Sequence, residues 1–239
     1  VRKNSAHSLG RIGDKKAIKP LIQILGSEDS EFRWSAKEAL VKVGASSEDL
    51  TLAFKSNNHY KREMALEALS EIEGKKSEII IKKALSDESG GVRWRAAEAV
   101  LKCYDDNSVN ILKNLSEEDP IFKVREESAK TLKAIEKKVK DLFNRFEDGL
   151  KFISEDIKAK NIKEGKSFFS PEKKLFEAHF FNPYKIRFYV YQGKEKIPEL
   201  DKMKDPEWGA IYLQREEDLE KVLEAVKKSY IMVKKEFNS

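Results

Sequence analysis

The sequence predicts an α-helical solenoid of stacked helical pairs, followed by a small α+β domain with a short antiparallel sheet. Three observations predict this fold class. A motif of about 31 residues recurs in the first part of the chain, a long helical pattern follows it, and aromatic-rich runs typical of strands appear after residue 166. We therefore expect a solenoid over 1–137, an amphipathic connecting helix over 138–162 and a small α+β domain over 163–239.

The repeat is anchored by arginines that stand 29 to 32 residues apart in the sequence. A small residue follows each anchor after three positions and an aliphatic residue after seven, which traces one side of a helix. A further apolar segment lies between successive anchors, so each repeat is expected to be a pair of helices. We expect the arginines to bond carbonyl groups or an acidic turn of the adjacent repeat. The anchors are Arg2, Arg33, Arg62, Arg93 and Arg125.

The segment AIKPLIQILGSEDSEFRWSAKEALVKVG, residues 17–44, resembles a HEAT-like repeat of the short type known from phycobilisome lyases. Pro20 in the first helix and the acidic turn that places Asp29 before Arg33 carry this resemblance. The resemblance implies a curved solenoid that holds a protein or peptide partner on its concave face.

The long helical pattern after the repeats is apolar on one side, and we expect the C-terminal part of the chain to cover that side. No glycine or proline interrupts residues 121–148. The last repeat helix therefore either continues into this helix or meets it at a tight turn near Lys137. The apolar positions include Val139, Leu142, Phe146, Leu150 and Ile157.

The C-terminal part combines strand-like and helical patterns. KLFEAHFF and YKIRFYVYQ flank Asn182-Pro183 and predict a hairpin, and WGAIYL at 208–213 predicts a third strand. Residues 216–233 predict a terminal amphipathic helix. The segment 206–230 resembles the end of a small uncharacterised α+β domain of archaea and bacteria, which implies no activity.

Composition and charge narrow the classes of function. The 239 residues include 47 basic and 42 acidic side chains and 40% hydrophobic residues, typical of a folded protein with a mixed-sign surface. Neither the repeats nor the C-terminal part carries the concentrated positive field of a nucleic-acid-binding protein. No apolar run is long enough for a membrane span, and we expect no membrane partner. The chain opens at Val1 inside the repeat pattern, and we expect it to be a fragment or processed form of a longer protein.

The sequence offers no cluster of metal ligands or catalytic groups. His7, His59 and His179 are isolated, and a His-Glu pair like those of the HEAT-type deoxyhypusine hydroxylase is absent. We therefore expect no metal, no cofactor and no catalytic residue. Cys103 is the single cysteine, which excludes an internal disulfide and favours the cytoplasm, and it falls in the buried stripe as a small hydrophobe.

The strongest candidate site is a repeated pair of tryptophan and glutamate. Residues four apart share a helix face, and a position two residues from the buried alanine lies about 200° around the helix, away from the core. We expect this surface to be concave and to bind a peptide, a flat ligand or a splayed base. The alternative is that Trp34 and Trp94 pack on Val41 and Leu101. The candidate binding residues are Trp34, Glu38, Trp94, Arg95 and Glu98.

These observations favour a non-enzymatic scaffold or adaptor that binds a protein or peptide partner. One alternative is an enzyme or enzyme subunit that acts on a flat ligand, either a nucleic-acid base or a tetrapyrrole. The first follows from a similarity of the Trp-x-x-x-Glu pairs to a HEAT-like family of DNA glycosylases, and the second from the resemblance to the lyases. The other alternative is a nucleic-acid-binding module without catalysis, for which Tyr184, Arg187, Tyr189 and Tyr191 form a basic aromatic strand.

Overall fold

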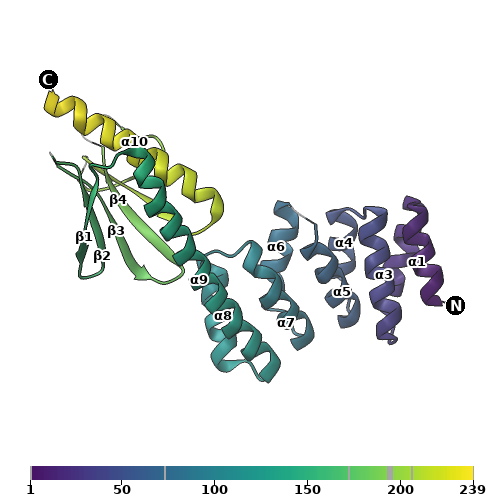
Figure 1. Cartoon of the computed structure of the whole chain (residues 1–239). Coiled ribbons are helices and arrows are strands. Elements are labelled where there is room, and N and C mark those ends of the chain that lie inside the picture. Colours follow the sequence, from purple (N-terminus) through teal and green to yellow (C-terminus); the bar gives the residue numbers. More distant parts are fainter. Residues whose placement is uncertain (1, 73, 172, 193–195, 206, 239) are drawn as a thin grey trace. The chain divides into compact units, whose positions relative to one another are not determined.

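The computed structural model describes residues 2–72, 74–171, 173–192, 196–205 and 207–238. The chain divides into two compact units, Val1–Lys133 and Ala134–Ser239 (Figure 1). The first unit is helical, and the second contains a six-stranded sheet. None of the helices in the described ranges combines the length and apolar character that crossing a membrane requires.

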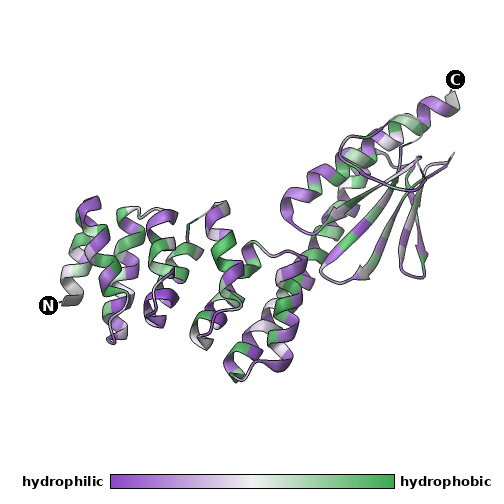
Figure 2. Cartoon of the chain, turned by 180° about the vertical axis from the view of Figure 1, so that it is seen from behind, coloured by the Kyte–Doolittle hydropathy of each residue, from purple (hydrophilic) through white to green (hydrophobic). Residues whose placement is uncertain are grey.

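The first unit is a stack of helical pairs in two layers, as the sequence predicts. In the first three complete pairs, each helix contacts its pair partner and the equivalent helix of a neighbouring repeat. The first helices of the pairs are α2 (Ile18–Ile24), α4 (Ser47–Phe54), α6 (Lys75–Ala84) and α8 (Asp106–Glu118), and the second helices are α1 (Arg2–Ile12), α3 (Ser30–Val43), α5 (His59–Ser70), α7 (Gly90–Ala99) and the start of α9 (Phe122–Ile153). Two short 3-10 helices, η1 (Lys15–Ala17) and η2 (Val100–Lys102), join this stack. Hydrophobic and hydrophilic residues interleave along the helices, as one-sided burial requires (Figure 2).

Helix ends follow the local sequence signals. Asp29 caps α3, because its side chain accepts a hydrogen bond from the Phe32 backbone N–H at 3.1 Å. Gly44 ends the same helix with a φ of 74°, a left-handed conformation that favours glycine. Pro20 lies in α2 and has no backbone N–H to donate. The first helical segment of this pair is divided into η1 and α2.

Small and aliphatic side chains fill the space between the layers. The alanines three positions after the anchors, Ala36, Ala65 and Ala96, are fully buried. Cys103 is buried too, as expected for a small hydrophobe in this stripe. Ile12 is an exception to the expected buried stripe, because its side chain is 72% exposed.

Two of the anchor arginines, Arg62 and Arg93, bind the acidic turn of the next repeat, as expected for a structural role. Arg62 donates to two carbonyls of its own turn, at 2.9 and 3.1 Å, and its guanidinium binds both oxygens of Asp87 in the next repeat at 2.9 and 3.0 Å. Arg93 repeats this pattern with Asp119 at 2.6 and 3.1 Å. Such bidentate pairs fix the register of the stack.

Arg33 keeps the carbonyl contacts of the other anchors but finds no carboxylate in the next turn. It donates to Ser27 and Glu28 at 2.6 and 2.8 Å. Asp87 and Asp119 stand six residues before the next anchor, and the following turn carries Ser56 at that position. The Arg33 guanidinium instead lies 4.1 Å from the ring centre of Tyr60. A cation–π contact therefore replaces the ion pair at this junction.

The second unit contains an antiparallel sheet in the order β1-β2-β3-β4-β6-β5. The predicted hairpin and third strand are present as β3, β4 and β6. The long helix ends at Ile153, earlier than the expected residue 162, and residues 158–162 form a strand instead. That strand is an exposed edge strand, so it lacks the alternating apolar pattern that would reveal it. The strands are β1 (Lys158–Ile162), β2 (Gly165–Phe169), β3 (Lys174–Asn182), β4 (Lys185–Tyr191), β5 (Asp201–Lys202) and β6 (Trp208–Leu213).

The core of the second unit lies between one face of this sheet and two helices, the end of α9 and α10 (Glu216–Asn238). Helix α9 is continuous from the last repeat, which answers the question that the sequence left open. Phe146 of α9 is at its centre, with ring centres 5.6 Å from Phe176 and 4.7 Å from Phe188. The apolar side of α9 is therefore covered within this unit, as expected.

Candidate binding surface

Trp34 projects from α3 on the layer of second helices and is 37% exposed. Two cations lie near its ring: Lys37 Nζ at 4.9 Å and the guanidinium carbon of Arg95 at 5.2 Å from the ring centre. The two cations come from different helices, because Lys37 is one turn further along α3 and Arg95 belongs to α7. The ring of Trp34 thus lies near one cation of its own helix and one cation of a distant repeat.

Arg95 brings the two predicted tryptophans into one surface. Its guanidinium carbon also lies 4.2 Å from the ring centre of Trp94, beside it on α7. It forms ion pairs with Glu67 at 3.2 Å and with Glu63 and Glu98 at 3.6 Å each. The buried Nε of Arg95 donates no hydrogen bond to a described residue, so charge and ring contacts hold this side chain.

The middle of the surface consists of carboxylates from α5 that the sequence analysis missed. Glu63 and Glu67 follow Arg62 by one and five positions, the same offsets at which Trp34 and Glu38 follow Arg33. Aligning the repeats would have found them. This repeat has no tryptophan, however, and in the sequence its glutamates are indistinguishable from those of an ordinary solvent-exposed helix face.

The surface extends at both ends through lysines. Lys37 is buried and forms an ion pair with Glu71 at 2.6 Å. Lys123 of α9 places its Nζ 3.6 Å from the ring centre of Trp94. We call the Trp34–Trp94 surface the set Trp34, Lys37, Glu63, Glu67, Trp94, Arg95, Glu98 and Lys123.

Glu38 is the one predicted residue that the structure leaves apart from this set. It is exposed on α3, and no ion pair or hydrogen bond to another described residue involves it. The structure therefore brings together Trp34, Trp94, Arg95 and Glu98 and places Glu38 outside their contacts.

Burial raises the pKa of Glu67, and the repulsion from Glu98 and Glu71 adds to this rise. The positive charges of Arg95 and Lys37 oppose it. The two cations near Trp34 thus limit the rise in the pKa of this carboxyl. Within the described ranges, no group of three or more His, Cys, Asp or Glu side chains could hold a metal ion.

Comparisons with known proteins agree with the stacked helical pairs. The fold is that of a helical-repeat protein, and the family model described as HEAT repeats matches residues 1–52 and 47–133. The chain belongs to the HEAT repeat family. No curated protein matches it. Among solved structures, the crystal structure of an engineered protein from the Northeast Structural Genomics Consortium is 20% identical, with a TM-score of 0.36, and the match covers 64% of this chain and 83% of that one.

Proposed function

We propose that this protein is a non-enzymatic scaffold or adaptor and that the Trp34–Trp94 surface binds a protein or peptide partner. The observation that carries the proposal is the contact of one guanidinium, that of Arg95, with tryptophans from two separate repeats. HEAT repeats commonly serve as protein-interaction scaffolds, and repeat stacks offer extended surfaces for this purpose.

The composition of this surface is that of an interaction hot spot. Tryptophan and arginine are the residues most enriched where truncation costs the most binding energy. Trp34 leaves 37% of its surface accessible, while Arg95 is held by Glu63 and Glu67 before any partner arrives. A side chain that is already ordered loses less conformational entropy on binding.

The charges around the tryptophans favour an extended segment with both polar and apolar groups. A partner carbonyl or carboxylate can accept a hydrogen bond from the guanidinium of Arg95, and an apolar side chain can pack on the open part of Trp34. Glu98, with a 54% exposed side chain, would form part of a polar rim.

The proposal is tested by selecting peptides from a displayed random library on the full chain. The affinities of the enriched peptides are then measured on the double variant Trp34→Ala/Trp94→Ala. We expect affinity to fall by at least about tenfold, as for the loss of a hot spot. The matched control is Leu52→Ala/Ile79→Ala, which removes two exposed apolar side chains from the first helices, α4 and α6.

The control variant should bind as the wild type does. Equal affinity of the wild type and the tryptophan variant for every enriched peptide would contradict the proposal. Binding of a labelled oligonucleotide or a bilin with tryptophan quenching, in place of peptide binding, would favour the alternative of a flat ligand.

A further inference from the structure

Helices α9 and α10 run side by side and parallel within the second unit. Arg145 forms an ion pair with Glu216 at 2.6 Å near one end of the contact. Near the other end, the Tyr230 hydroxyl donates to Ser154 Oγ at 2.9 Å. Between these points the helices approach closely, since a Cβ built on Gly149 would lie 2.9 Å from both methyl carbons of Leu223.

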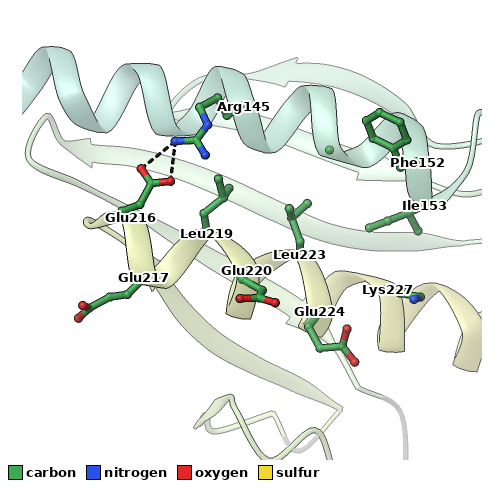
Figure 3. Close-up of a pocket in the computed structure, with 11 residues that line it drawn as sticks. Arg145, Phe152, Ile153, Glu216, Glu217, Leu219, Glu220, Leu223, Glu224 and Lys227 are labelled. Carbon is green, nitrogen blue, oxygen red and sulfur yellow. Dashed lines mark hydrogen bonds and ion pairs between the residues drawn. The ribbon is translucent and has the colours of Figure 1, made fainter.

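A groove of about 820 Å³ lies along this helix pair (Figure 3). Its apolar part comes from both helices, and Figure 3 shows Leu219 and Leu223 pointing from α10 toward α9. Phe152 and Ile153 complete it from the last turn of α9. The groove belongs to the second unit alone and shares no residue with the Trp34–Trp94 surface.

Phe152 is the most unusual side chain of the groove, because it is 93% exposed. Phe143 and Phe146, the other phenylalanines of the α9 part in the second unit, are buried against the sheet. Phe152 instead follows Arg145 and Gly149 at spacings of seven and three, which places all three on a separate side of the helix. The ring of Phe152 therefore extends the apolar surface of the groove, and contiguous exposed apolar surface is typical of interaction sites.

The polar rim of the groove carries more carboxylates than cations. Glu216, Glu217, Glu220 and Glu224 line it, against Arg145 and Lys227, on a protein whose net charge is +5. Glu216 is neutralised by Arg145, and Glu217 forms an ion pair with Arg215 at 2.8 Å. Glu220 forms no ion pair or hydrogen bond with a described residue, and Glu224 is 3.9 Å from Lys228.

We propose that this groove binds an amphipathic helical segment of a partner protein whose apolar side is flanked by lysine or arginine. Apolar side chains at positions i, i+3 or i+4 and i+7 would pack on Phe152, Leu219 and Leu223, and the flanking cations would face Glu220 and Glu224. The α10 residues of the groove span Glu216 to Lys227, a length of about 16 Å, so about three turns of a partner helix match it.

The test is a titration of the full chain with a fluorescein-labelled helical peptide. The peptide carries leucine at i, i+3, i+4 and i+7 with flanking lysines, and a matched peptide has glutamate in place of each lysine. We expect the basic peptide to bind at least about tenfold more tightly than the acidic one, a preference that added salt reduces.

Two variants assign the site. Phe152→Ser should weaken the basic peptide by at least about tenfold. Glu220→Lys/Glu224→Lys should reverse the preference between the two peptides. All three side chains are exposed, so circular dichroism should show an unchanged fold. The control is Ile79→Ser, a 64% exposed residue of the first unit, which should bind as the wild type does.

Absent binding, equal affinity for the two peptides, or insensitivity to the charge reversal would each overturn the proposal. So would a concentration-dependent dimer in light scattering that Phe152→Ser abolishes, because a second copy of the chain would then occupy the groove. The Trp34→Ala/Trp94→Ala variant should bind this peptide normally. Failure of this inference is therefore distinguishable from failure of the proposed scaffold function.

Discussion

The guanidinium of Arg95 lies 5.2 Å from the ring centre of Trp34, although a complete repeat with helix α5 separates the two residues in the sequence. The side chain reaches this far because Glu63 and Glu67 of α5 attract it along the way. Ion pairs thus link α5 to both neighbouring repeats, to α3 through Lys37 and Glu71 and to α7 through Arg95. The exposed Trp34 lies near both cations.

Arg95→Gln should destabilise the first unit, and the loss should grow with pH. The pKa of Glu67 is already raised in the folded state, so this carboxyl binds protons more tightly in the folded protein than in the unfolded chain. The free energy of unfolding therefore falls as the pH rises above the pKa of glutamate in the unfolded chain, about 4.3. Removing the cation raises this pKa further. We expect the free energy of unfolding to fall by about 1 to 3 kcal/mol at pH 7 and by less at pH 4.5.

Urea unfolding followed by tryptophan fluorescence measures this loss at the two pH values. Arg95→Lys retains the charge and should lose less stability than Arg95→Gln. A cost for Arg95→Gln that stays constant from pH 4.5 to 7 would show that Glu67 does not depend on Arg95.

Asp119→Ala should be among the costliest single substitutions in the repeat stack. Burial alone would raise the pKa of Asp119, but hydrogen bonds from Arg93 and from the Ile121 backbone N–H, with the charges of Arg93 and Arg125, lower it overall. The substitution leaves Arg93 without its carboxylate at a buried junction, for which we expect a loss of about 3 kcal/mol.

The matched control is Glu88→Ala, which removes an 82% exposed partner of Arg62. Exposed ion pairs contribute little, and we expect a change below about 0.5 kcal/mol. Similar losses from both substitutions, measured by thermal unfolding, would refute the proposed importance of the buried pair of Arg93 and Asp119.

The repeat stack was predictable from the sequence because each repeat supplies independent evidence for the same pattern. The hairpin β3–β4 was predictable because both strands are rich in aromatic residues and flank the turn residues Asn182 and Pro183. Strand β1 was not, because the exposed edge position places no apolar requirement on Lys158–Ile162.

At the candidate surface, the sequence singled out the tryptophans but could not predict that Arg95 lies near both of them. This arrangement depends on how far Arg95 extends past α5, which is a property of the packed helices. The groove beside Phe152 was equally hidden, because it requires the parallel arrangement of α9 and α10.

The second unit should become less stable as the pH is lowered, because the Glu177 carboxylate becomes protonated. Burial alone would raise the pKa of Glu177, but hydrogen bonds from Lys174, His179 and Ser167 lower it to about 2. Because the folded-state pKa is lowered, the Glu177 carboxylate stabilises the fold at pH values above the pKa of glutamate in the unfolded chain, about 4.3. This stabilisation is lost as the pH falls toward 2.

Glu177→Gln should therefore cost about 2 kcal/mol at pH 7 and progressively less below pH 4. Amide hydrogen exchange of β3 and β4 reports on this unit specifically. A difference between the wild type and the variant that persists undiminished at pH 2.5 would exclude the carboxylate as its source.

Gly165→Ala should severely destabilise the sheet. A Cβ at this position would lie 1.8 Å from the Ala178 carbonyl oxygen of the paired strand, so β2 and β3 would have to separate. We expect a loss of more than about 3 kcal/mol and reduced exchange protection in β2 and β3.

Gly13→Ala is the control with which the stability cost of Gly165→Ala is compared. Gly13 has a φ of 72° but no atom within 4 Å of an added Cβ, so only the backbone preference is lost, at a cost of about 1 kcal/mol. An equal cost at the two positions would contradict the close approach of β2 to β3.

The most direct test of the scaffold account is ¹⁹F NMR of the chain labelled with 5-fluorotryptophan, because its three tryptophans report on separate places. Trp34 and Trp94 lie on the proposed binding surface, and Trp208 on β6 serves as an internal reference. On titration with a peptide selected on the full chain, we predict that the Trp34 and Trp94 resonances shift together in a saturable manner while Trp208 stays in place. Saturable binding that shifts Trp208 alone, or no tryptophan at all, would contradict the claim that the Trp34–Trp94 surface receives the partner.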